Sequence, residues 1–156
     1  MKFAAIALVA AAQASESQFP SFDSLHAHCS LTTTFNDSCH NTFAALDDTV
    51  VSFTDPASGI YAMKEVASDH YVWVTRTTPV KKYVDDIIFE VSGDGSSCTV
   101  TSKSRSQTLS YYDYDTNYCN MYNVFRNSGV TFDSPKLGDC KWVPEAADLE
   151  ATCNKY

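Results

Sequence analysis

The spacing of apolar residues predicts a helix near the start of the chain. Apolar side chains recur there at three- and four-residue steps, at Phe43, Leu46, Val50 and Phe53. This spacing forms one apolar face and predicts a helix of about fifteen residues with its cap within 36–38. The pair Asp55-Pro56 ends this helix, because proline cannot continue the helical hydrogen bonds. We also expect a short helix at 24–29.

The middle of the chain changes to a pattern typical of strands. Four segments are rich in β-branched and aromatic residues, and they predict strands at 60–66, 71–78, 83–91 and 98–106. The turn 92–95 contains two glycines and joins the last two strands. In the fourth strand, polar and small or apolar side chains alternate, so one face of the sheet is expected to contact solvent.

Helical spacing returns in the last third of the chain. Apolar residues at Tyr118, Met121, Tyr122 and Phe125 predict a helix capped by Asp115 or Thr116 and ended at Gly129. Pro144 opens a short terminal helix at 145–151. Together the elements predict an α+β fold: a four-stranded, largely antiparallel sheet packed on two or three helices and stabilised by disulfides.

Length and charge narrow the classes of function. The chain has 156 residues, of which 44% are hydrophobic, enough for the core of one globular domain. Acidic residues outnumber basic ones by 19 to 11, which gives a formal charge of −8. This surplus of negative charge opposes binding to phosphate backbones, so we expect no nucleic-acid partner.

The first residues predict export from the cytosol. Lys2, an apolar run at 3–12 and the step Ala12-Gln13-Ala14 follow one another as in a secretory signal, which predicts a signal peptide at 1–14 and a single secreted domain at 15–156. The run is shorter than the roughly 20 residues that span a bilayer, so no membrane span is expected. The protein is expected outside the cell or in the lumen of the secretory pathway. In a eukaryotic host, Asn36 of the sequon 36–38 is a predicted glycosylation site.

Six cysteines predict a disulfide framework in that oxidising compartment. They are Cys29, Cys39, Cys98, Cys119, Cys140 and Cys153. Sequence alone does not choose among the many pairings that six cysteines allow. Order along the chain suggests that each cysteine bonds the next one, which gives Cys29–Cys39, Cys98–Cys119 and Cys140–Cys153.

Four short segments carry a resemblance to a known family. They are Val84-Asp85-Asp86-Ile87-Ile88-Phe89-Glu90-Val91, Gly93-Asp94-Gly95, Ser104-Arg105-Ser106 and Asp113-Tyr114-Asp115-Thr116-Asn117. In this order, over residues 84–127, the chain resembles a domain family of unknown function found in bacteria and plastids. The resemblance implies an α+β fold and implies no activity. Adjacent side chains on a strand point to opposite faces, so Asp85 and Asp86 are not expected to form a carboxylate pair.

No motif in the sequence predicts a catalytic, metal or cofactor site. The motifs G-x-S-x-G and H-E-x-x-H are absent. His26, His28 and His40 lie near cysteines, as zinc ligands do, but disulfide bonding of those cysteines is the favoured interpretation. The segment 113–117 opens like a calcium loop, yet Tyr118 and Val124 occupy positions that such a loop gives to glycine and glutamate.

The candidate binding residues are aromatic and basic. Exposed tyrosines offer a large contact area with a polar tip, and the basic residues are expected on the solvent face of the sheet. The candidates are Tyr111, Tyr112, Tyr114, Arg76, Lys103 and Arg105. They favour a secreted binding or structural module with an unknown protein partner.

Two other functions stay open at this point. The first is a carrier that holds a small apolar ligand between the sheet and the helix around Leu46. The second is a hydrolase whose triad is assembled from distant residues, with His70, Asp69 and serines such as Ser104 or Ser106 as its members.

Overall fold

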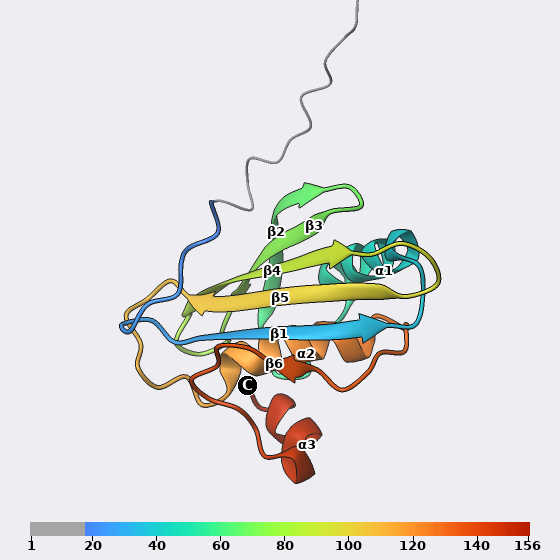
Figure 1. The fold of residues 1–156 in the computed structure, drawn as a ribbon. Coiled ribbons are helices and arrows are strands. Elements are labelled where there is room, and N and C mark those ends of the chain that lie inside the picture. Colours follow the sequence, from blue (N-terminus) through green and yellow to red (C-terminus); the bar gives the residue numbers. More distant parts are fainter. Residues whose placement is uncertain (1–17) are drawn as a thin grey trace, which may run out of the picture.

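The structure is a computed structural model that describes residues 18–156, and the predicted signal peptide lies outside these residues. It has one antiparallel sheet of six strands, in the order β2-β3-β4-β5-β1-β6. Figure 1 shows α1 and α2 on the same face of this sheet, with α3 beyond its β6 edge. The elements are β1 (His28–Phe35), α1 (Cys39–Ser52), β2 (Ile60–Ala67), β3 (Tyr71–Thr77), β4 (Val84–Ser92), β5 (Cys98–Ser106), α2 (Thr116–Asn127), β6 (Lys136–Leu137), the 3-10 turn η2 (Ala146–Asp148) and α3 (Leu149–Cys153).

The α+β class is confirmed, and the predicted strand count of four is wrong. Strands β2 to β5 and helices α1 and α2 lie where the apolar spacing predicts them. The sheet gains β1 and β6, and the short helix expected at 24–29 is absent from the described structure, because β1 already begins at His28. Three consecutive threonines at 32–34 leave β1 with few apolar residues, although β-branched threonine favours strands.

The main core lies between the sheet and the two long helices. Helix α1 contributes the predicted face of Phe43, Leu46 and Val50, and α2 contributes Met121, Val124 and Phe125. The sheet supplies the opposing layer, with Leu31, Phe35, Val72, Val74, Ile87, Phe89 and Val100. The space between α1 and the sheet is therefore filled by side chains, and this is where the carrier hypothesis placed its ligand.

Three disulfides are present, but not in the pairing suggested by chain order. The bonds are Cys29–Cys140, Cys39–Cys98 and Cys119–Cys153. The register of the sheet explains one of them, because Phe35 at the end of β1 lies opposite Cys98, and α1 begins just after that strand. Each bond thus joins segments that are neighbours in space and distant in sequence, with separations of 111, 59 and 34 residues.

In the described residues, no helix has the length and apolar character needed to cross a membrane.

Candidate functional site

The three candidate tyrosines lie on the surface, just before α2. Tyr111, Tyr112 and Tyr114 are 63%, 62% and 66% exposed. The Tyr112 ring lies 5.0 Å from that of Tyr111 and 5.4 Å from that of Trp142. The Trp142 indole nitrogen donates a hydrogen bond of 3.0 Å to the Tyr111 carbonyl oxygen. We call Tyr111, Tyr112, Tyr114 and Trp142 the tyrosine surface.

The three candidate basic residues do not share one face of the sheet. Lys103 and Arg105 lie on the outer face, where Lys103 forms an ion pair of 3.1 Å with Glu90. Arg76 lies on the inner face and is only 1% exposed, so its predicted place on the solvent face is wrong. Residues 71–74 of β3 are buried on both faces, so the strand shows no polar alternation from which the orientation of Arg76 follows.

Arg76 forms a buried ion pair beside the end of α1. Its Nε atom donates a hydrogen bond of 2.7 Å to Oδ2 of Asp55, which is 4% exposed. A side chain at Gly59 would collide with both partners of this pair. The loop after α1 therefore ends the helix and also accommodates the ion pair, because it supplies Asp55 and has no side chain at Gly59.

A buried polar network fills the space between the sheet and the first turns of α2. Ser106 donates a hydrogen bond of 2.7 Å to Asp85, which also accepts one of 2.9 Å from Asn120. In the same network, the Ser104 hydroxyl donates a hydrogen bond of 2.7 Å to the Asn117 side-chain oxygen. The Asn117 amide in turn donates to Asp113 over 2.7 Å. The polar network comprises Asp85, Ser104, Ser106, Asp113, Asn117 and Asn120.

Burial sets the proton affinity of the two carboxyl groups in this network. Desolvation raises the pKa of Asp85, and the hydrogen bonds from Ser106 and Asn120 oppose this effect. Desolvation likewise raises the pKa of Asp113, against its hydrogen bonds from Asn117. Asp113 also caps α2, because its carboxylate accepts from the Asn117 backbone N–H, whereas the side chain of Asp115 makes no capping bond.

Asp85 and its neighbour Asp86 point to opposite faces, as predicted. Both are buried and only 2% exposed. On the outer face Asp86 accepts hydrogen bonds from the Trp73 indole (3.0 Å), from Lys64 (2.8 Å) and from Gln107 (2.9 Å).

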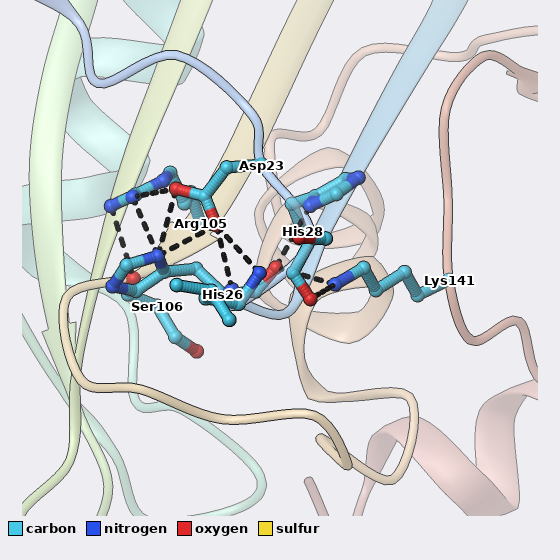
Figure 2. Close-up of polar contacts among 8 residues, drawn as sticks. Asp23, His26, His28, Arg105, Ser106 and Lys141 are labelled. Carbon is cyan, nitrogen blue, oxygen red and sulfur yellow. Dashed lines mark hydrogen bonds and ion pairs between the residues drawn. The ribbon is translucent and has the colours of Figure 1, made fainter.

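A second polar cluster joins the segment before β1 to the end of β5, and Figure 2 shows its members. Asp23 accepts a hydrogen bond of 2.7 Å from Arg105 and lies 2.8 Å from Nδ1 of His26. These two contacts hold the pKa of Asp23 well below its usual range, and the contact with His26 has the larger effect. Lys141 donates to the main-chain oxygens of Ser24 and His26, which fixes this segment to the C-terminal part of the chain.

The histidines and serines considered for zinc binding or hydrolysis are dispersed. Within residues 18–156, no group of three or more histidine, cysteine or acidic side chains could hold a metal ion. The Asp69 carboxylate lies 2.8 Å from Nδ1 of His40, so it contacts His40 instead of His70. Ser104 and Ser106 are buried in the polar network. The structure therefore does not bring the imagined triad together.

The sequon has structural contacts of its own. Asn36 is exposed, and its side-chain amide donates a hydrogen bond of 3.4 Å to Thr131. Ser38 caps α1 by accepting a hydrogen bond from the Asn41 backbone N–H. Glycosylation of Asn36 stays a prediction.

A family comparison agrees with the resemblance seen in the sequence. Residues 9–126 match the model of a family described as "Protein of unknown function (DUF1499)". The chain belongs to this family. No protein with a curated description matches the chain.

Three of the four segments that carried the resemblance meet in the folded chain. Asp85 of β4, Ser104 and Ser106 of β5, and Asp113 and Asn117 at the start of α2 all belong to the polar network. Sequence reasoning placed these residues on the correct elements but did not predict that they touch. Alternation along β5 was the available signal, because it puts Ser104 and Ser106 on the same face as Val100.

Proposed function

We propose that this member of the DUF1499 family is a secreted, disulfide-stabilised binding module whose tyrosine surface contacts a protein partner. The observation that supports the proposal is the exposure of Tyr111, Tyr112 and Tyr114, each above 60%. Tyrosine and tryptophan often dominate the binding energy of protein interfaces, because they bury much area and lose little conformational freedom.

The fold holds the tyrosine surface in place before any partner binds. Tyr111 is fixed by the bond from Trp142, and Lys141 lies 5.6 Å from its ring. The neighbouring Cys140 is bonded to Cys29 of β1. A preorganised surface spends little free energy on ordering its side chains when it binds.

The disulfides support the proposed compartment. All six cysteines are paired, and disulfides persist mainly in oxidising environments such as the secretory pathway. The protein recovered from culture medium is expected to begin at Ser15 and to lack six hydrogens relative to the fully reduced chain. A cytosolic protein that retains residues 1–14 would contradict this part of the proposal.

The tyrosine surface is tested by partner capture with matched variants. The test variant replaces Tyr111, Tyr112 and Tyr114 with alanine. The control replaces Val51 and Ile60, which are 72% and 62% exposed and lie elsewhere, with alanine. A partner that binds the wild type and the control, and binds the test variant at least about tenfold more weakly, supports the proposal. Equal binding by all three proteins would refute it.

A second candidate function is the transport of a small apolar ligand, and a different pocket from the expected one favours it. A cavity of about 460 Å³ lies between α2 and the C-terminal segment, within the usual size range of ligand sites. Its lining is mostly apolar and aromatic: Tyr118, Tyr122, Phe132, Ser134, Pro135, Leu137, Val143, Pro144, Ala146 and Leu149. Native mass spectrometry of the protein from culture medium tests this function, because a carrier releases a bound small molecule on denaturation.

A further inference from the structure

A second pocket, of about 280 Å³, lies between the β3–β4 turn and the C-terminal residues. Its lining combines three basic side chains with apolar and aromatic ones: Arg76, Lys81, Lys155, Thr78, Thr116, Pro79, Val80, Tyr83 and Tyr156. We call it the basic pocket. It is separate from the cavity between α2 and the C-terminal segment, with which it shares no lining residue.

Beside the basic pocket, Arg76 has two buried hydrogen-bond donors without partners within residues 18–156. It lines the pocket while being only 1% exposed, which places it at the inner end. Its Nε atom is bound to Asp55, but neither terminal nitrogen of the guanidinium has a hydrogen-bond partner among the described residues. Buried donors without partners are costly, and a planar guanidinium fork matches the oxygens of a carboxylate or phosphate.

The charge around the pocket favours a negatively charged ligand. The chain carries a formal charge of −8, yet three of its 11 lysines and arginines line this pocket and no acidic residue does. Asp55 balances the charge of Arg76 through its ion pair with Nε, so the net positive charge of the lining comes from Lys81 and Lys155.

We propose that the basic pocket binds a small molecule that carries one carboxylate or phosphate group on an apolar or aromatic body. The terminal nitrogens of Arg76 hold the anionic group, and Lys81 and Lys155 attract it at the entrance. Tyr83, Tyr156 and Val80 contact the apolar body. Most ligand pockets are roughly 300 Å³ or larger. This pocket, at about 280 Å³, is at the small end of that range, so it suits a ligand of about one ring.

Calorimetric titration with three one-ring probes tests this site. Benzoate and phenyl phosphate carry the anionic group, and benzamide is a neutral molecule of similar shape. At ~0.15 M salt, where surface charges are screened beyond roughly 8 Å, at least one anion is expected to bind in a 1:1 ratio and benzamide is not. The tighter of the two anions identifies the group that the site prefers.

Variants of the lining residues locate the binding. Lys81→Gln and Lys155→Gln are each expected to weaken binding about two- to fivefold, and Lys136→Gln, an exposed lysine of β6 outside the pocket, is the matched control. Arg76→Lys keeps a positive charge for Asp55 but loses the fork, so it is expected to weaken binding at least about tenfold. Thermal unfolding checks that Arg76→Lys is folded, and the two pocket lysine variants carry the test if it is not.

Three results would overturn the assignment. They are the absence of binding by both anions at millimolar concentration, equal binding of benzamide, and an equal loss of affinity in Lys136→Gln and Lys81→Gln. Each of these results leaves the tyrosine surface untouched, because the proposed partner contacts do not include Arg76, Lys81 or Lys155.

Discussion

The two ends of helix α2 face the same sheet with opposite chemistry. Near its C-terminus, Val124 and Phe125 are fully buried among the rings and aliphatic side chains of the core. Near its N-terminus, Asn117 and Asn120 are equally buried, but they lie in the polar network with Asp85. Apolar packing stabilises a fold directly, whereas a buried polar network only recovers the cost of removing its groups from water.

The polar end of α2 is therefore the part of the helix whose composition is not explained by stability alone. The polar end of α2 adjoins Arg76 and the basic pocket, whose lining includes Thr116. The network also leaves the side-chain oxygen of Asn120 without a hydrogen-bond partner among the described residues. An apolar replacement of such a network is often neutral or stabilising, so stability alone does not account for its presence.

The largest effect is expected at the apolar end. Phe125→Ala removes a fully buried ring that lies 5.4 Å from Phe35 and 5.7 Å from Phe89. It should lower the free energy of unfolding by about 3–5 kcal/mol, measured by urea denaturation. Val51→Ala, at a residue that is 72% exposed on α1, is the control and should change it by less than about 0.5 kcal/mol. A loss below about 1 kcal/mol for Phe125→Ala would contradict the assignment of the apolar end as the stabilising half.

At the polar end, removal of one partner is expected to cost less. Asn117→Ala removes one buried hydrogen bond from Asp113 and one from Ser104, which should lower the free energy of unfolding by about 1–3 kcal/mol. Asn127→Ala changes an exposed asparagine of the same helix and is the control. If both variants unfold at the same urea concentration, the network is not held together as described.

The raised pKa of Asp85 predicts the direction in which the stability of the protein changes with pH. Its pKa in the folded protein lies above the ordinary value of 3.8, so the folded state loses stability as the pH rises from about 3.8 through that raised pKa. Asp85→Asn removes this titration. Relative to the wild type, the variant should therefore become more stable between pH 4 and pH 7. Urea denaturation at both pH values measures this difference, and an unchanged difference would show that Asp85 is not desolvated.

The helical spacing of apolar residues was sufficient to predict α1 and α2, and segments rich in β-branched and aromatic residues were sufficient to predict β2 to β5. Both signals failed for β1, where Thr33 lies on the buried face between Leu31 and Phe35 and lowers the contrast between the two faces, and for the two-residue β6. The disulfide pairing and the polar network depend on contacts between distant segments. The register of β1 against β5 and the docking of α2 decide those contacts, and no local pattern encodes them.

The smallest effect is expected at the exposed carboxylate of the N-terminal segment, and its sign is opposite to that of Asp85. Asp23 is partly exposed, and its contacts with His26 and Arg105 lower its pKa in the folded protein. Its contribution is therefore present above its ordinary value of 3.8 and is lost as the pH falls toward the lowered pKa. Asp23→Asn should destabilise the protein slightly at pH 7, less than Asn117→Ala does, and the difference from wild type should shrink as the solution is acidified below pH 4. Urea denaturation from pH 7 to pH 3 measures this change. Asp23 and Asp85 are the same residue type, so only their surroundings distinguish them. Asp23 lies near the surface beside two nitrogen donors, and Asp85 lies in a desolvated network beneath α2. If the stability difference from wild type changes with pH in opposite directions for the two variants, these surroundings explain it. Changes in the same direction would contradict that explanation.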